Sequence, residues 1–369
     1  MNRSVAIIGT RGYPSYYGGF ETAVRRLAPF LADNDWDVTV YGRMGSTRQD
    51  DPDLDARVHA VTTLGVETKA ISTLSYGLSS SIHASVRKPD AAIVMNVANG
   101  YFLPILRSRG IPTLVNVDGI EWDRDKWGRV AKAVFKGGAR MTARFADQVV
   151  VDSTEIGRRW DSDFGRQGVF IPYGGDPRPL LPVEPGYDSG GYVLMVARFV
   201  PENTVIEFFD AVRLLGGRFP VVIVGSSGYG GELDREAESL AREVPNVSWL
   251  GHVSNDARLF ALWQHSGAYF HGHSVGGTNP ALVQAMALGA PTVARDTVYN
   301  REVLGETSIF VASDPQAIAN AITRLMTSSV SQESLRQSAM RRAASDYTWQ
   351  RVGESYLREL ENLTAKQRT

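Results

Sequence analysis

The sequence contains no cysteine, which excludes disulfide bonds and thiolate metal sites. The formal net charge of its 369 residues is −1, so no overall positive field favours nucleic acid as a partner. No apolar run approaches the ~18 residues that a membrane-spanning helix needs. The apolar run at residues 5–8 stops at Gly9 and is too short for a signal peptide. We therefore expect a soluble, cytoplasmic protein.

Several catalytic and cofactor motifs are also missing. The compact G-x-G-x-x-G turn of dinucleotide-binding folds does not follow the first predicted strand. Neither an H-E-x-x-H pattern nor a Ser-His-Asp arrangement is present. His271 and His273 lie two residues apart, but no third metal ligand is evident. We expect each histidine to pack in the protein or to make one hydrogen bond to a ligand. No metal or other cofactor is expected.

Two acidic clusters have the composition of carboxylate metal sites, one at Asp51, Asp53 and Asp55 and one at Asp123 and Asp125. The first lies in a polar stretch between predicted strands, away from the strand ends where ligands bind in α/β folds. We predict that both clusters are solvated loops.

Short apolar runs alternate with helical patterns along the chain, which predicts an α/β fold with doubly wound parallel sheets. The length allows two domains of about 150 residues each. Predicted strands lie at 5–8, 38–41, 91–95, 113–117 and 148–151, and then at 192–196, 221–224, 247–250, 267–271 and 291–294. Because residues 172–191 are rich in proline and glycine, we predict an interdomain linker there. The predicted domains are residues 1–175 and 190–346, with ligand bound in the cleft between them.

Two predicted helices begin directly after glycine turns. One follows Gly18 and Gly19, and the other follows Gly276 and Gly277. In the second, Asn279 is predicted as the N-cap, Pro280 takes the first helical position and Gly289 ends the helix. Backbone amides at the positive end of a helix dipole form an anion site, so each turn is a candidate phosphate site. Taken alone, each is also an ordinary capped helix.

Arg198 directly follows the first predicted strand of the second domain. An arginine at a strand end suits a diphosphate, because its planar guanidinium binds two oxygens at once. The alternative is a surface ion pair with Glu202. The spacing leaves both open.

Asp118 and Glu121 follow the predicted strand at 113–117. Two carboxylates at a strand end could polarise an acceptor hydroxyl. The alternative, which the sequence alone favours, is a helix N-cap at Asp118 with Glu121 as the third residue of a capping box.

Five basic residues recur three or four positions apart and would share one face of a helix: Arg129, Lys132, Lys136, Arg140 and Arg144. Such a face can dock on an anionic membrane surface. An ordinary solvated face is the default interpretation. The adjacent glycines Gly137 and Gly138 are expected to weaken the helix.

Together these segments resemble the retaining nucleotide-sugar glycosyltransferases of family 4, which have the GT-B fold of two facing Rossmann-like domains. The resemblance rests on Gly-Thr-Arg-Gly-Tyr-Pro at 9–14, Tyr-Gly-Gly-Phe-Glu-Thr at 17–22, Asp-Gly-Ile-Glu-Trp at 118–122, Ala-Arg-Phe-Val-Pro-Glu-Asn at 197–203 and His-Gly-His-Ser-Val-Gly-Gly-Thr-Asn-Pro at 271–280. Within that family the chain is similar to a bacterial subgroup that includes capsule and cell-wall rhamnosyltransferases.

The resemblance implies transfer of a hexose from a nucleotide sugar to a glycan, lipid-linked or small-molecule acceptor, with no metal. It also implies a terminal helix at about 349–369 that packs back on the first domain. Asp118, Glu121 and Arg198 are the implied catalytic residues. The implied donor-binding residues are Gly18, Gly19, Arg198, Asn203, His273, Gly276, Gly277, Thr278, Asn279 and Gln284. Peripheral contact with the inner face of the membrane stays open.

Three positions depart from the broader family pattern. A lysine near the phosphates is replaced by Asn203, two glutamates eight residues apart by Gly276 and Gln284, and a histidine by Asp118 as in the subgroup. Loss of both glutamates keeps open a non-catalytic protein that binds nucleotide sugar or glycan.

The residue at 284 also bears on the donor. In the family a glutamate at this place receives the 2′ and 3′ hydroxyls of ribose, whereas glutamine offers one acceptor oxygen. Gln284 therefore favours a deoxyribose donor such as thymidine-diphosphate rhamnose, with uridine- and guanosine-diphosphate sugars as alternatives.

Overall fold

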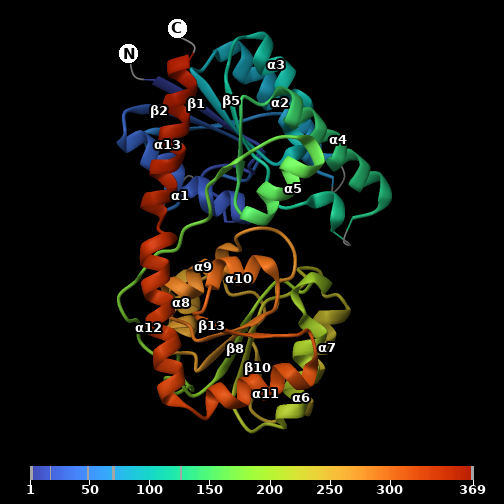
Figure 1. The fold of residues 1–369 in the computed structure, drawn as a ribbon, viewed down its shortest axis with the longest axis vertical. Coiled ribbons are helices and arrows are strands. Elements are labelled where there is room, and N and C mark those ends of the chain that lie inside the picture. Colours follow the sequence, from blue (N-terminus) through green and yellow to red (C-terminus); the bar gives the residue numbers. More distant parts are fainter. Residues whose placement is uncertain (1–2, 17, 48–49, 69–70, 125–126, 367–369) are drawn as a thin grey trace. The chain divides into compact units, whose positions relative to one another are not determined.

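A computed structural model describes residues 3–16, 18–47, 50–68, 71–124 and 127–366. The chain divides into two compact units. Unit 1 consists of Met1–Tyr173 and Trp349–Thr369, and unit 2 of Gly174–Thr348. Each is built around one parallel sheet with helices packed against it (Figure 1). The predicted α/β class with doubly wound sheets is therefore confirmed.

The sheet of unit 1 has seven strands in the order β3-β2-β1-β4-β5-β6-β7. Because helices cover a parallel sheet, the central strands β1 and β4 are continuous apolar runs. The strand order reverses beside β1, which pairs with both β2 and β4. The strands are β1 (Arg3–Ile8), β2 (Trp36–Gly42), β3 (Val58–Thr62), β4 (Ala91–Met95), β5 (Thr113–Asn116), β6 (Gln148–Val151) and β7 (Val169–Phe170).

The helices of unit 1 include the last helix of the chain. Tyr356 and Leu360 of this helix, α13, are buried in the core of unit 1, and the Tyr356 hydroxyl accepts a hydrogen bond of 2.7 Å from Asn116. The helical elements are α1 (Gly19–Asp33), α2 (Ser72–Arg87), η1 (Val97–Phe102), α3 (Leu103–Ser108), η2 (Glu121–Asp123), α4 (Arg129–Phe145), α5 (Thr154–Phe164) and α13 (Trp349–Lys366).

Unit 2 has a six-stranded sheet in the order β10-β9-β8-β11-β12-β13. The strands are β8 (Val193–Val196), β9 (Val221–Val224), β10 (Val247–Trp249), β11 (Ala268–His271), β12 (Thr292–Arg295) and β13 (Ser308–Val311). The helical elements are η3 (Pro201–Asn203), α6 (Val205–Leu215), α7 (Glu232–Glu243), α8 (Asp256–His265), α9 (Pro280–Ala287), α10 (Val298–Leu304), α11 (Pro315–Met326) and α12 (Ser329–Asp346).

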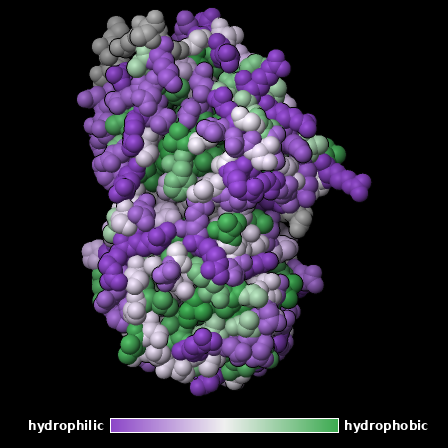
Figure 2. Space-filling view, viewed as in Figure 1, coloured by the Kyte–Doolittle hydropathy of each residue, from purple (hydrophilic) through white to green (hydrophobic). Residues whose placement is uncertain are grey.

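All ten predicted strands are present, and their ends differ from the prediction by at most two residues. The sequence does not predict β3, β7 and β13, which lie at edges of the two sheets. On the visible face of each unit, hydrophilic side chains cover most of the surface and apolar side chains gather in smaller patches (Figure 2). Within the described ranges, no helix combines the length and apolarity that crossing a membrane requires.

Gly137 and Gly138 do not interrupt α4, so the expected weakening of this helix is wrong. A Cβ atom at Gly138 would lie 2.4 Å from the carbonyl oxygen of Val97, and one at Gly137 would lie 2.0 Å from the Tyr101 hydroxyl. The glycines therefore allow α4 to pack closely against η1, and this packing offsets their low helix propensity.

Candidate functional site

The predicted donor residues of unit 2 follow two neighbouring strands. β8 and β11 are parallel, with Met195 paired to Phe270, so both chains leave the sheet at the same edge. Arg198 comes two residues after β8, and the segment 272–279 comes directly after β11. The carboxyl edge of a doubly wound sheet is where such folds bind ligands.

The two segments that leave β8 and β11 are in direct contact. The Thr204 hydroxyl donates to the Gly272 carbonyl oxygen at 2.6 Å, and the Ser274 amide donates to the Glu202 carbonyl oxygen at 2.9 Å. A Cβ atom at Gly272 would lie only 2.3 Å from the carbonyl oxygen of Asn203. Glycine is therefore required at 272, and it fixes the path of the chain into the turn before α9.

Asn203, at the position of the family's lysine, joins these segments through its side chain. Its Nδ2 donates to the Arg198 carbonyl oxygen at 2.7 Å, which places Oδ1 toward the ring of His273. Oδ1 lies 2.6 Å from Nδ1 of His273. Since an amide oxygen only accepts, Nδ1 of His273 carries a proton. Asn203 is 7% exposed and thus positions its neighbours more than it presents a group to a ligand.

Arg198 has an exposed side chain. Glu202, its predicted ion-pair partner in the alternative interpretation, is buried with 7% of its surface exposed. Among the residues that the structure describes, no carboxylate lies within ion-pair distance of Arg198. The ion-pair alternative is therefore wrong, and the Arg198 side chain is exposed just after the carboxyl end of β8.

The start of α9 has the predicted capping geometry. The Asn279 side chain accepts hydrogen bonds from the amides of Ala281 and Leu282 at 3.0 and 3.3 Å, and Pro280 is the first helical residue. Gly276 adopts a φ of +91°, which a side chain would disfavour, while Gly277 and Thr278 are buried. Because Asn279 occupies the amides of the first turn, an anion at this end would meet the turn 276–279.

Gln284, the fifth residue of α9, has an unpredicted partner. Its Oε1 accepts from the Asp176 amide at 3.0 Å, and its Nε2 donates to the Asp176 carbonyl oxygen at 2.8 Å. A Cβ atom at Gly175 would lie 2.8 Å from the carbonyl oxygen of Val283. Gln284 thus holds residues 175–176 against α9. One lone pair of Oε1 and one hydrogen of Nε2 remain for a ligand.

Asp118, at the carboxyl end of β5 in unit 1, is half-buried and left-handed, with a φ of 56°. Its amide donates to Oδ1 of Asn116 at 3.0 Å. The next helical element, η2, has Ile120 at its N-cap position and no side-chain cap. The capping-box alternative is therefore wrong. A non-glycine residue held at positive φ is strained, which is typical of functional positions.

Glu121 has a different environment from Asp118. It is 4% exposed, forms a close ion pair with Arg124 and accepts a hydrogen bond of 2.7 Å from Nε1 of Trp127. Both carboxylate oxygens therefore have protein partners. This geometry suits a group that holds the segment after β5 in place.

Gly18 and Gly19 lie where the sequence predicts, at the start of α1. Gly18 is extended at the N-cap position, and its carbonyl oxygen accepts from the Thr22 amide at 3.0 Å. The sequence does not predict a role for Glu21 in the first turn of α1. Its side chain is 7% exposed and accepts a hydrogen bond from the Arg11 amide at 3.0 Å. Its carboxylate lies 3.2 Å from the position of a Cβ at Gly18. This helix end therefore already holds a negative group of the protein.

Tyr173 was also missed, because the proline- and glycine-rich composition around it indicated only a linker. It is 5% exposed. Burial raises the pKa of Tyr173 well above its usual value, and the negative charges of Asp118 and Asp152 raise it further. The carboxyl edge of the unit 1 sheet thus brings Asp118 close to a neutral buried phenol.

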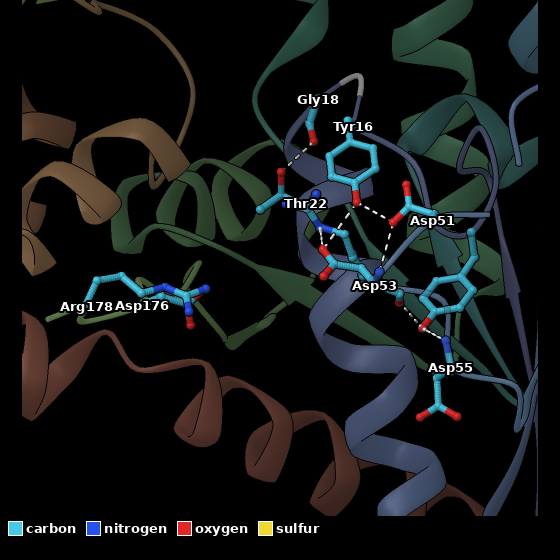
Figure 3. Close-up of polar contacts among 10 residues, drawn as sticks. Tyr16, Gly18, Thr22, Asp51, Asp53, Asp55, Asp176 and Arg178 are labelled. Carbon is cyan, nitrogen blue, oxygen red and sulfur yellow. Dashed lines mark hydrogen bonds and ion pairs between the residues drawn. The ribbon is translucent and has the colours of Figure 1, made fainter. Parts of the chain in front are cut away.

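The loop with Asp51, Asp53 and Asp55 is largely exposed, as predicted, and it also contacts the segment before α1. The Tyr16 hydroxyl donates to Asp51 at 2.6 Å and to Asp53 at 3.3 Å (Figure 3). The Tyr13 hydroxyl donates to the Asp53 carbonyl oxygen and accepts from the Asp55 amide, both at 3.2 Å. The loop therefore holds the glycine-rich segment in place.

In the other acidic cluster, Asp123 accepts from Arg159 at 2.8 Å, and Asp125 lies outside the described residues. No group of three or more acidic or histidine side chains that could hold a metal ion occurs in the described part of the chain. His271 is 4% exposed, with Nδ1 3.0 Å from the Tyr269 hydroxyl. Burial lowers the pKa of His271 to about 3, so its ring is a neutral core group.

The basic face of α4 is displayed on the surface of unit 1. Arg129, Lys136, Arg140 and Arg144 are exposed, and Lys132 is half-buried. Val130 is 80% exposed, whereas Val134, Met141 and Phe145 are half-buried. The helix therefore turns most of its apolar side chains inward and its cations outward.

Two family models match the chain. Residues 190–328 match the family described as Glycosyl transferases group 1, and residues 2–176 match a domain of unknown function, DUF1972. The phosphatidyl-myo-inositol mannosyltransferase of Mycobacterium leprae (strain TN) is 30% identical over 230 residues, which are 57% of this chain and 58% of that protein. The chain thus spans less than two thirds of the length of this relative.

Solved structures resemble the whole chain. Sucrose-phosphate synthase from Thermosynechococcus elongatus has a TM-score of 0.81 and 18% identity, with 99% of this chain and 100% of that chain covered. Anabaena HepE in complex with UDP-glucose has a TM-score of 0.75 and 15% identity, with 98% and 100% covered. These likenesses confirm the GT-B fold, which combines two Rossmann-like domains.

Proposed function

We propose that this protein is a retaining glycosyltransferase that transfers a hexose from a nucleoside diphosphate sugar to an acceptor hydroxyl. The observation that carries the proposal is the junction of Arg198, Asn203 and His273 at the edge of the unit 2 sheet. There the segment with the exposed Arg198 is hydrogen-bonded through Asn203 to the segment that leads into the capped helix α9. The match of residues 190–328 to Glycosyl transferases group 1 covers this junction and supports the same reaction.

The chemistry follows from where charge develops. As the glycosidic bond breaks, negative charge builds on the leaving diphosphate, which Arg198 and the amides of the turn 276–279 would stabilise without a metal. No side chain of this junction is an evident nucleophile. In the proposed mechanism the acceptor hydroxyl attacks the face that the diphosphate leaves and passes its proton to the departing phosphate. Asp118 orients that hydroxyl, while Glu121 stabilises the segment after β5 through its contacts with Arg124 and Trp127.

The proposed donor is a thymidine-diphosphate sugar, rhamnose being the favoured hexose. Gln284 keeps one acceptor lone pair after its bonds to Asp176, and a deoxyribose presents a single hydroxyl to it. Uridine- and guanosine-diphosphate sugars are the alternatives. Because HepE was solved with UDP-glucose, uridine diphosphate is the first nucleotide whose affinity should be compared with that of thymidine diphosphate.

The proposed acceptor is a glycan or a lipid-linked sugar of polysaccharide biosynthesis, met at the inner face of the membrane. The exposed cations of α4 support this location, because anionic lipids attract such a surface.

A non-catalytic nucleotide-sugar binder is the second candidate, because Gly276 and Gln284 replace both glutamates of the family pattern. A panel of nucleoside diphosphates and their sugars, scored by thermal shift, tests binding, since a ligand of the native state raises its apparent stability. Incubation of the best donor with crude lipid and glycan acceptors then tests transfer. Ligand stabilisation with neither donor hydrolysis nor transfer would favour the binder, and a product with inverted configuration would contradict the retaining mechanism.

A further inference from the structure

A small, partly open cavity lies at the carboxyl ends of β1 and β2 in unit 1, against α2. It is lined by Gly9 and Thr10 after β1, by Gly42 at the end of β2 and Arg43 after it, and by Thr73 and Ser80 of α2. The volume of the cavity is about 10 Å³, which is enough for one group of the size of an oxygen atom or a water molecule. It lies at the same sheet edge as Asp118.

Arg43 is the charged residue of this cavity and is only 9% exposed. Its Nε has no hydrogen-bond partner among the described residues. A terminal nitrogen lies 3.8 Å from Glu67, whose own side chain is 57% exposed. The guanidinium also lies 5.4 Å from the centre of the Tyr76 ring. A buried cation with so distant a carboxylate costs folding free energy, which indicates a role other than stability.

The burial of Arg43 also has an electrostatic consequence. Burial lowers the pKa of Arg43 below its usual value, and the nearby positive charge of Arg11 lowers it further. An anion that entered the cavity would relieve both penalties, because it would replace lost hydration and offset the repulsion.

A second buried polar atom beside the cavity also lacks a partner within the described ranges. This atom is Oδ1 of Asn99, a residue with 1% exposure. Asn99 packs against two residues of the cavity wall, since a Cβ atom at Gly9 or Gly77 would come within 2.5 or 1.9 Å of its side-chain amide. An amide oxygen only accepts hydrogen bonds, so Asn99 would not contact the oxygen of an anion, and Arg43 is the donor that this cavity offers.

We propose that this cavity binds one oxygen of an anionic group, a phosphate or a carboxylate, that the acceptor carries. The inference rests on the proposed function and specifies its acceptor. From β2 to β5 the sheet has three interstrand spacings, which separate Arg43 from Asp118 by roughly 14 Å. The acceptor is therefore extended, with its charge held far from the hydroxyl that receives the sugar.

The cavity is tested on the full chain with simple anions. Inorganic phosphate, acetate and neutral glycerol are titrated calorimetrically at constant ionic strength, in an Arg198→Ala background that removes the proposed diphosphate site. Arg43→Met should weaken binding of the preferred anion at least tenfold, and Arg43→Lys several-fold, because a lysine lacks the guanidinium fork. Arg87→Met, which removes an exposed arginine at the end of α2, is the matched control.

Two further readouts separate binding from folding. Without ligand, Arg43→Met should unfold at the same or a higher temperature than the natural protein, since a poorly paired buried charge is removed. In transfer assays it should raise the KM for the charged acceptor and leave kcat and nucleotide affinity unchanged. The relative strength of phosphate and acetate tells which group the acceptor carries.

The outcomes are distinguishable from those of the proposed function. Equal anion affinity in the natural protein and in either Arg43 variant would overturn the proposal that the cavity binds an anion. A loss of affinity in Arg87→Met as large as that in Arg43→Met would also overturn it. Failure of the natural protein to bind any nucleotide would contradict the proposed glycosyltransferase. The phosphate titration would still decide on the cavity.

Discussion

Oδ1 of Asn203 lies 2.6 Å from Nδ1 of His273, across the two segments that follow β8 and β11. The Arg198 carbonyl oxygen fixes the orientation of the Asn203 amide and so the position of the proton on the histidine ring. A residue that replaces the family's lysine therefore organises the turn in front of α9 instead of adding a positive charge. The cations of this edge are Arg198 and Arg295, whose guanidinium donates to the Thr204 hydroxyl at 3.0 Å.

Arg198→Ala should weaken binding of the preferred nucleoside diphosphate by about 1.5–3 kcal/mol, the usual effect of losing a charged hydrogen bond. Calorimetry on the purified protein measures it. Arg324→Ala, which removes an exposed arginine from α11 of the same unit, controls for the change in net charge. Unchanged affinity after Arg198→Ala would remove Arg198 from the donor site.

Asp118→Asn should lower the rate of transfer while donor affinity and the free energy of unfolding stay near those of the natural protein. Asparagine tolerates the left-handed backbone at this position, so the substitution mainly removes the charge. Steady-state kinetics, nucleotide calorimetry and urea unfolding are compared with those of Asp161→Asn, an exposed residue of α5. A loss of stability with an unchanged rate would assign Asp118 a structural role.

Gln284→Glu should have two effects. A carboxylate cannot donate to the Asp176 carbonyl oxygen, and the loss of this partner should cost about 1–3 kcal/mol of unfolding free energy. The second acceptor oxygen should improve binding of uridine and guanosine diphosphates relative to thymidine diphosphate. Gln316→Glu on α11 makes the same change of charge at an exposed position. A natural protein that prefers uridine or guanosine diphosphate would contradict the thymidine donor.

His271→Gln should flatten the dependence of stability on acidic pH. Burial lowers the folded pKa of His271 to about 3, whereas an unfolded histidine titrates near ~6.5. Between these values the unfolded chain binds the additional proton, so stability is full above about pH 6.5 and falls with pH by up to ~1.4 kcal/mol per unit. Urea unfolding across this range measures the slope. His252→Gln, which changes an exposed histidine, should leave the slope of stability against pH unchanged. An unchanged slope in His271→Gln would contradict the lowered pKa of His271.

Simultaneous replacement of Lys136, Arg140 and Arg144 by glutamine should reduce co-sedimentation of the protein with anionic vesicles. Addition of salt should weaken the attachment of the natural protein, because surface attraction is screened. Replacement of Arg235, Arg242 and Arg324 of unit 2 by glutamine removes as many charges from other surface helices. Equal recovery of the natural protein in the supernatant with and without vesicles at low salt would contradict membrane docking.

The sequence predicts every strand inside the two sheets and misses three of the four edge strands, namely β3, β7 and β13. Residues 221–224 form an unbroken apolar run, and all four are buried in β9. In β3 a single residue of five is buried, and in β13 one of four. β3 exposes most of its side chains to solvent and therefore lacks a continuous apolar run, whereas the apolar residues of β13 are too few to indicate a strand by themselves.

The site shows a similar division. Local chemistry identifies Asn279 as a cap and Arg198 as a strand-end cation, since both depend on immediate neighbours. The bond between Gln284 and Asp176 joins residues 108 positions apart, and the burial of Glu121 and Arg43 depends on helices that pack over them. Such partners are set by tertiary packing, which spacing along the chain does not specify.

The Gly175 amide donates to the Tyr347 carbonyl oxygen at 2.8 Å, so the two ends of unit 2 are joined by a hydrogen bond. A module whose entry and exit points touch can be excised as one continuous piece, and a short bridge can close the host chain behind it. Residues 174–348 should therefore fold when expressed alone, whereas unit 1 requires a linker from Tyr173 to Trp349 to keep its final helix. The same arrangement would let recombination exchange unit 2 of such a protein as a single cassette while unit 1 keeps its fold.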